Sequence, residues 1–270
     1  MRIRKELEKV PGFEVANHRI DSWWWLVAAV VAIVALLAGL EPDPYWRIIK
    51  FVSDGLLVTI GVTITAFILT LILGLVTALG RLSKNGFVRW FTTIYVEVAR
   101  GVPLLVQLLF WYFAFPSIIQ ALGRLINYEP FTHYLANPFA MAILGLTFCY
   151  SAYMSEIYRA GIQSVPKGQN EAARSLGMTH NQAMRHVILP QAFRTVLPPV
   201  GNEFISLLKD SSLVSVVSVA DITRRGREFM AASFLPVETW MMIALIYLIM
   251  TLISARVVAW IERKTQTEAR

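Results

Sequence analysis

The sequence predicts an all-α integral membrane protein with six transmembrane helices. Apolar residues make up 56% of the chain and charged residues 16%, and the mean hydropathy is +0.55. An ordinary soluble domain is about 45 to 50% apolar and about 25% charged. Five stretches that lack Asp, Glu, Lys and Arg also reach the length of about 17 residues or more that a helix needs to cross the hydrocarbon. These stretches are residues 22–40, 55–80, 101–123, 130–155 and 239–255.

The first of these stretches is predicted to be a peripheral helix. It carries no polar side chain between Leu26 and Leu40, so it has nothing with which to line a pathway. Trp23, Trp24 and Trp25 at its start are typical of the aromatic belt at a membrane surface. The stretch lacks the small-residue cleavage site of a signal peptide, so we interpret it as an anchor that stays in the protein.

The sixth span is predicted at residues 195–219, which have the right length but include Glu203, Lys209 and Asp210. A charged side chain is costly inside a bilayer unless it faces protein or water. This helix is therefore expected to face a protein partner or a water-filled cavity.

The distribution of basic residues predicts the sidedness of the chain. Most lysines and arginines lie in the segments that this arrangement places in the cytoplasm, so both termini are predicted to lie inside. Arg224, Arg225 and Arg227 fall on the outer side and oppose this assignment. Either the outer loop tolerates them or the last two spans are misplaced. The net charge of +7 follows from the inner segments, and no nucleic-acid partner is expected, because no basic stripe interleaved with aromatic residues is present.

The inner segment 166–194 predicts a docking site for a partner protein. Gly177 is suited to end a helix in the left-handed conformation, and Thr179 with Gln182 forms a capping box for the next helix. Pro190 then interrupts that helix before the following span. Links between helices of a bundle are usually about 2 to 8 residues long. A connector with two short helices is longer than packing alone requires.

Several kinds of chemistry are excluded by missing motifs. The Gly-Lys pair of a phosphate-binding loop does not occur, so any ATP hydrolysis belongs to a partner chain. The G-x-S-x-G and H-E-x-x-H motifs of hydrolases and zinc proteases are also absent. The one cysteine, Cys149, permits neither an intrachain disulfide nor a thiolate metal site. The chain is therefore predicted to be no enzyme and to hold no metal or cofactor of its own.

The inner segment also carries a family resemblance. Glu171-Ala-Ala, followed by Gly177 and by Val187-x-Leu-Pro190, resembles the EAA loop in the membrane subunits of ATP-binding-cassette importers, with Val187 in place of the usual Ile. The sequence is most similar to one branch, the polar amino acid permeases. That resemblance covers about residues 55–262 and rests on the blocks 61–65 (GVTIT), 95–107 (YVEVARGVPLLVQ), 152–168 (AYMSEIYRAGIQSVPKG) and 209–213 (KDSSL). The proline block reads Arg-Gly-Val-Pro where the family often has Arg-Gly-Thr-Pro.

The resemblance implies a type I importer fold with a five-helix core and one added N-terminal helix. In this arrangement residues 1–21 form a cytoplasmic tail, 22–40 the peripheral helix, 54–262 the core with its coupling loop at 166–194, and 263–270 a second cytoplasmic tail. Residues implied to couple the chain to an ATPase are Glu171, Ala172, Ala173, Gly177, Thr179 and Pro190.

The resemblance also implies the partners and the location. Two ATPase subunits would bind ATP and Mg²⁺, and a second permease subunit, either the same chain or a homologous one, would complete the pathway. A periplasmic or lipid-anchored amino-acid-binding protein would deliver the solute. The chain would lie among the lipids of the bacterial cytoplasmic (inner) membrane as a multi-pass protein and move polar or charged amino acids by alternating access.

An amino acid that crosses a membrane needs partners for both its charged ends, because an unpaired buried charge is costly. Glu97 and Arg100 are three residues apart, as are Glu156 and Arg159, so each pair could simply neutralise itself on one helical face. As a hypothesis, Glu156 and Glu203 attract the ammonium or a cationic side chain, while Arg100 favours the carboxylate. The full set of pathway candidates is Glu97, Arg100, Gln107, Tyr153, Glu156, Asn202, Glu203, Lys209 and Asp210.

Two alternatives belong to other functional classes. An ion-coupled secondary amino acid transporter is expected to show broken helices and duplicated halves, and it leaves the docking loop unexplained. A membrane-embedded enzyme needs a nucleophile or a metal set, and the sequence supplies neither. The sequence does not indicate which amino acid is carried.

Overall fold

The structure is a computed structural model that describes residues 22–267, and this part of the chain contains helices and no strand. Within residues 22–267, five stretches are long and apolar enough to span a membrane. They are α2 (Ser22–Leu40), α3 (Pro42–Arg81), residues 104–126, α8 (Pro138–Ser164) and α13 (Pro236–Thr267). The prediction of an all-α membrane protein is confirmed. The predicted tail at 1–21 lies outside the described residues, whereas residues 263–267 continue α13.

The sixth predicted span is present as a helix but does not reach the hydropathy of the other five. It comprises α11 (Leu189–Asp210) and a 3₁₀ segment, η3 (Ser211–Val217). Its charged residues and the internal prolines Pro198 and Pro199 lower its apolar character. A count of six spans therefore stays a prediction, and α11 is the helix on which it depends.

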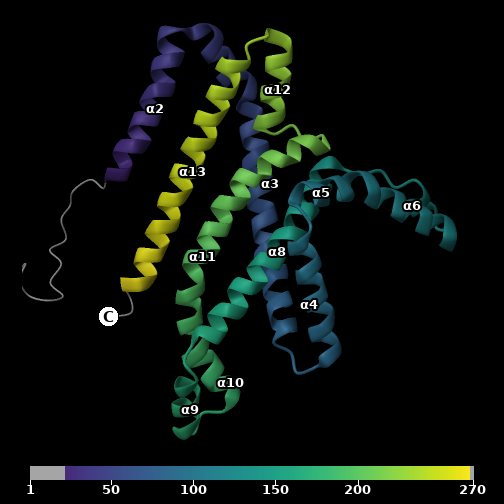
Figure 1. The fold of residues 1–270 in the computed structure, drawn as a ribbon, viewed down its shortest axis with the longest axis vertical. Helices are drawn as coiled ribbons and strands as arrows, with labels where there is room; N and C mark the ends of the chain where they lie inside the picture. The colour runs from purple at the N-terminus through teal and green to yellow at the C-terminus, as the bar shows by residue number, and fades with distance from the viewer. Residues whose placement is uncertain (1–21, 268–270) are drawn as a thin grey trace, which may run out of the picture.

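The helices form a bundle with two distinct ends (Figure 1). The pair α3 and α8 lies at the centre, and α2 lies beside α13 at one edge, as expected of a peripheral helix. The short helices α9 (Lys167–Ser175) and α10 (His180–Ala183) project from one end, which we call the α9 end. Helix α12 (Ile222–Ser233) and the α2–α3 connection lie at the opposite end, the α12 end.

The apolar stretch predicted to be one span at 101–123 is broken in the structure. Helix α4 (Gly86–Gly101) stops before an extended Val102, and α5 (Leu104–Leu109) begins after Pro103. The Gln107 side chain bridges the break, because its Nε2 donates to the carbonyl oxygens of Ala99 and Val102, both at 2.8 Å. Gln107, a pathway candidate by sequence, thus satisfies backbone groups that the break leaves without helical partners.

Two π-helical segments each precede a proline. The first, η1 (Phe110–Ala114), stands two residues before Pro116 at the start of α6 (Phe115–Ile126), and the second, η2 (Met184–Ile188), stands two residues before Pro190. Proline has no N–H and clashes with the carbonyl four residues earlier, and prolines and π-bulges are both features at which helices bend. The sequence suggested that Pro190 interrupts the helix, but the helical path does not end there. The path continues from α10 through η2 into α11.

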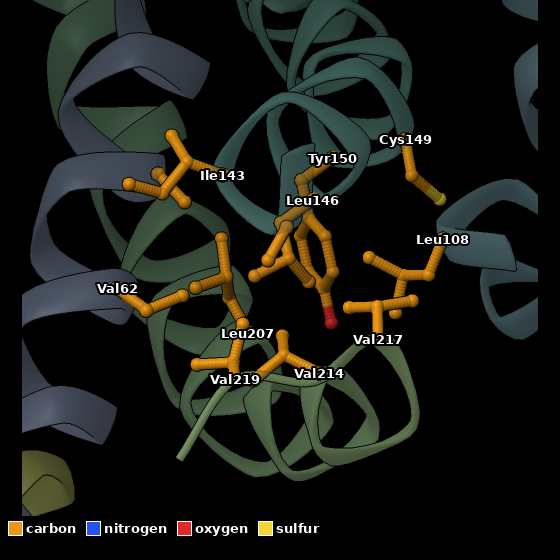
Figure 2. Close-up of a cluster of buried hydrophobic side chains, with 12 residues drawn as sticks. Val62, Leu108, Ile143, Leu146, Cys149, Tyr150, Leu207, Val214, Val217 and Val219 are labelled. Atoms are coloured by element: carbon orange, nitrogen blue, oxygen red, sulfur yellow. The ribbon is translucent and has the colours of Figure 1, made fainter. Parts of the chain in front are cut away.

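The core lies where α3, α5, α8, α11 and η3 meet. Its buried side chains include Val62, Leu146, Leu207 and Val214, and the Tyr150 ring stands among them (Figure 2). The helices α3 and α8 approach closely because Gly74 has no side chain: a Cβ at this position would lie 2.7 Å from the Cβ of Met154. This packing fixes α8, which carries polar residues on one side and leads into α9.

Candidate functional site: the coupling segment and the polar centres

The turn after α9 has the conformation that the sequence predicts. Gly177 has a φ of +84°, in the left-handed region. The N–H of Met178 donates to the carbonyl of Ala173 at 3.2 Å, and the N–H of Gly177 donates to that of Arg174 at 3.0 Å. These two bonds define a Schellman motif, which favours glycine because the position requires a positive φ.

The capping box that follows is also present. The backbone N–H of Thr179 donates to Gln182 Oε1 at 2.8 Å, and the N–H of Gln182 donates to Thr179 Oγ1 at 3.3 Å. Ala173 and Ala183 are buried where α9 packs against α10 and η2. The segment 166–194 is therefore a compact helical pair with its own packing.

In the single chain, the outer surface of α9 is exposed and available to a partner protein. Glu171 and Ala172 are exposed, and Leu176 is 81% exposed although it is a large apolar residue. Ala173 faces inward, so the two alanines of the motif have different surroundings: Ala172 offers a small contact surface and Ala173 permits close internal packing. An exposed leucine beside small residues is suited to insertion into a groove of another protein.

A charged centre surrounds Glu156 on α8. Its carboxylate accepts hydrogen bonds from Arg159, with Nε at 2.9 Å and Nη2 at 2.7 Å, and from Arg81 at the end of α3. Arg100 of α4 lies 3.5 Å from the same carboxylate and stacks over the Tyr153 ring at 5.3 Å. The predicted pairing of Glu156 with Arg159 thus holds, but it is one part of a cluster that joins three helices.

A second polar centre lies around Tyr150, six residues before Glu156 on α8. The Tyr150 hydroxyl donates to Asp210 Oδ2 at 2.7 Å, and Figure 2 shows this hydroxyl directed away from α8 toward Val214 and Val217. Glu203 is half-buried and lies seven residues before Asp210 on α11, which places it about two turns earlier on the same face. The rings of Tyr150 and Tyr153 lie 6.3 Å apart, so the two tyrosines connect a carboxylate-rich centre to the arginine-rich one.

The remaining pathway candidates lie apart from these centres. Glu97, Asn202 and Lys209 are exposed. Among residues 22–267, neither Glu97 nor Lys209 takes part in an ion pair. In particular, Glu97 does not pair with Arg100, which turns to Glu156 instead. Exposure of these side chains leaves them available to a neighbouring subunit or to solvent.

Sequence reasoning missed Tyr150 and Arg81. Tyr150 precedes Tyr153 by three residues on α8, so that these two rings are neighbours was visible in the sequence, but the partner of Tyr150 lies 60 positions away. Arg81 was counted as one of the inner basic residues at the end of a span, and nothing local indicates that it reaches Glu156.

The α12 end carries its own ion pairs. Arg225 Nε donates to Asp54 Oδ2 at 3.0 Å and its Nη1 to Glu228 Oε2 at 2.9 Å, while Arg224 Nε donates to Glu228 Oε1 at 3.0 Å. Arg227 donates to the carbonyl of Ser215 at 2.9 Å. The three arginines that opposed the charge-based orientation therefore each have a partner at this end.

The electrostatics of α12 follow from these contacts. Hydrogen bonds from Arg225 hold the pKa of Glu228 below its usual range, and the Asp54 carboxylate raises the pKa of Arg225. Burial raises the pKa of Asp221, the residue that caps α12 by accepting from the N–H groups of Thr223 and Arg224. The start of α12 is thus fixed to α3 and α13 by polar contacts that include Tyr247 at 3.3 Å from Asp221.

Comparison with known proteins gives consistent similarities. Residues 70–267 match the model of the family described as binding-protein-dependent transport system inner membrane component. The chain is 43% identical to the L-cystine transport system permease protein TcyB of Bacillus subtilis over 70% of this chain and 74% of that protein. It is 35% identical to the arginine transport system permease protein ArgU of Corynebacterium glutamicum over 91% of this chain and 83% of that protein.

A solved structure shares the same fold. The crystal structure of an amino acid ABC transporter with histidines superposes with a TM-score of 0.70 at 38% identity, covering 85% of this chain and 98% of that chain. The match therefore covers most of this chain and leaves little of the neighbouring chain unmatched.

Proposed function

Because this chain belongs to the family of binding-protein-dependent transport system inner membrane components, we propose that it is the membrane-spanning permease subunit of an ATP-driven amino acid importer. The observation that carries this proposal is its identity of 35 to 43% with permeases of amino acid transport systems over most of its length. A secondary transporter driven by an ion gradient is not favoured, because it has no use for a segment like α9. The chain itself acts in transport, and ATP hydrolysis belongs to separate ATPase chains.

The α9 end is where the ATPases would dock. The exposed surface of Glu171, Ala172 and Leu176 supports this contact, and the Schellman turn at Gly177 holds it away from the bundle. Two ATPase subunits would bind ATP and Mg²⁺, and their closure would move α9 together with α8 and α11. Thr179 and Pro190 would act as the cap and the bend that join α9 to α11.

The partners on the other side follow from this orientation. With the α9 end and both chain termini in the cytoplasm, the α12 end faces outward and meets a periplasmic or lipid-anchored binding protein. A second permease subunit, the same chain or a homologous one, would close the pathway in the cytoplasmic membrane. The ion pairs of Arg224 and Arg225 would keep α12 in a defined position at this contact.

The two polar centres on α8 suggest how the solute is handled. Arg100 lies at one end of the Tyr150–Tyr153 pair, and Asp210 lies at the other. A polar amino acid can offer its carboxylate to the first and a cationic group, its ammonium or a basic side chain, to the second. Glu156 is bound by three arginines, so we assign the ammonium to Asp210 and Glu203 and give Glu156 the task of holding Arg100.

The test is uptake of a radiolabelled amino acid by proteoliposomes that contain the chain, its ATPase and its binding protein. Uptake is expected to require ATP and to be independent of an imposed ion gradient. Asp210→Asn is expected to lower uptake at least tenfold while the ATPase still co-purifies, and Glu129→Gln, at an exposed carboxylate of α7 (Glu129–Thr132), serves as the matched control. Uptake driven by an ion gradient without ATP would overturn the proposal, and equal uptake by the two variants would overturn the assignment of Asp210.

A further inference from the structure

A cavity of about 700 Å³ lies near the α9 end, at the junction of four helices. Leu75 of α3, Ile162 of α8 and Val196 of α11 contribute apolar side chains to its wall. Tyr158, Arg194 and Thr265 contribute polar groups. The cavity is thus mainly apolar with one cationic group, which is the pattern of a site for a molecule with an apolar body and an anionic end.

The position of the cavity along the spans is well defined. The apolar spans end at Arg81, Ser164 and Thr265. The lining residues of α3, α8 and α13 lie within about the last two turns of these spans, and the others lie in the first turns of α11. Lys264 lies 5.6 Å above the ring of Trp260 in the same stretch of α13. Such an aromatic and basic pair is typical of the level where hydrocarbon meets lipid head groups.

Within the described residues 22–267, the charge at the cavity has no carboxylate partner. Arg194 is exposed, and within residues 22–267 no carboxylate forms an ion pair with it. An arginine at the head-group level binds phosphate through charge-assisted hydrogen bonds. Basic pockets between transmembrane helices on the cytoplasmic side are suited to anionic lipid head groups.

We propose that this cavity binds one anionic phospholipid, with its phosphate at Arg194 and an acyl chain against Leu75, Ile162 and Val196. Pro190 also lines the cavity, so the lipid contacts the chain where the coupling segment joins α11. Occupancy would therefore favour one position of α9 relative to the bundle. This inference goes beyond the transport function and does not depend on which solute is carried.

The experiment is native mass spectrometry of the assembled transporter in detergent, titrated with dioleoyl phosphatidylglycerol or dioleoyl phosphatidylcholine. The anionic lipid is expected to bind about tenfold more tightly, the factor that one charge-assisted contact supplies. Arg194→Gln should remove this preference. Arg89→Gln, an equally exposed arginine of α4 that does not line the cavity, should keep it.

A second variant tests the volume of the cavity instead of its charge. Thr265→Trp places a large ring in the cavity and is expected to weaken both lipids, while the ATPase still co-purifies. Equal affinity for the two lipids, an unchanged preference in Arg194→Gln, or unchanged binding in Thr265→Trp would each overturn the proposal. Absence of any bound lipid would overturn the proposal too, and would indicate that a neighbouring subunit fills the cavity. Lipid binding can fail while ATP-dependent uptake persists, so this result is separable from the test of transport.

Discussion

Replacing Glu156 with Gln removes the one carboxylate that three arginines share. The Glu156 side chain is 22% exposed and that of Arg81 is 13% exposed, whereas Arg159 and Arg100 are 32% and 43% exposed. The substitution therefore leaves the guanidinium of Arg81 largely buried and unpaired. Removing one partner of a buried ion pair costs about 3 to 5 kcal/mol, and partial solvent screening here reduces the expected loss to about 2 to 3 kcal/mol.

Thermal unfolding of the purified transporter measures this loss. In a chain of this size about 1 kcal/mol shifts Tm by roughly 2 to 4 °C, so Glu156→Gln should lower Tm by about 5 to 10 °C. Arg159→Gln should have a much smaller effect, because Glu156 keeps Arg81. Combining Glu156→Gln with Arg81→Met should recover part of the loss, since the double variant leaves no unpaired guanidinium at the end of α3.

One result would refute this reasoning. If Glu156→Gln kept the Tm of the unaltered protein and yet abolished uptake, the carboxylate would serve the solute and not the scaffold. The assignment of the ammonium to Asp210 and Glu203 would then be wrong as well.

Three further predictions concern the turn, the packing of α12 and its charges. Gly177→Ala should destabilise the coupling segment by about 1 to 2 kcal/mol. The cause is the backbone φ of +84° and not a clash, because no atom lies within 4 Å of the added Cβ. Limited proteolysis should show more cleavage than in Gly177→Asn, and equal cleavage of the two variants would contradict this cause. Gly55→Ala should lower Tm, by about 1 to 3 kcal/mol of stability, because its Cβ would lie 2.9 Å from backbone atoms of Asp221 and Ile222 at the start of α12. Gly86→Ala has open space and should be neutral. Glu228 has a lowered pKa in the folded chain, so its contribution to stability is present above the unfolded pKa of about 4.3 and is lost as the pH falls through the lower folded value. In an acid-unfolding series, Glu228→Gln should therefore lose less stability below about pH 4.5 than the unaltered protein. Identical curves for the two proteins would contradict this prediction.

The sequence predicted the features that depend on neighbouring residues. The Schellman turn at Gly177 and the capping box at Thr179 are local, since their partners lie within a few positions, and the structure confirms both. The five apolar spans were also predicted, because hydropathy is a local property, although the break before Pro103 was not. The helical character of the long polar connector 166–194 was predicted from the same local capping signals.

Contacts between distant parts of the chain were not accessible in this way. Glu156 meets Arg81 across 75 positions and Tyr150 meets Asp210 across 60. The nearer pairings of Glu156 with Arg159 and of Glu97 with Arg100 have the same spacing, yet the structure contains only the first. The choice depends on how α3 and α4 approach α8, and one sequence does not fix that approach.

The π segment before Pro190 sets the rotation of α11 relative to the segment before it. A π turn accommodates one residue more than an α turn, and one residue corresponds to a rotation of about 100° around the helix axis. Without that extra residue, α11 and the segment before it would be rotated relative to each other although the sequence of α11 was unchanged. Leu207 of α11 is packed in the core, so a one-residue deletion within 184–188 is expected to turn α9 and not α11. The direction in which the exposed surface of α9 faces thus depends on the number of residues ahead of the proline.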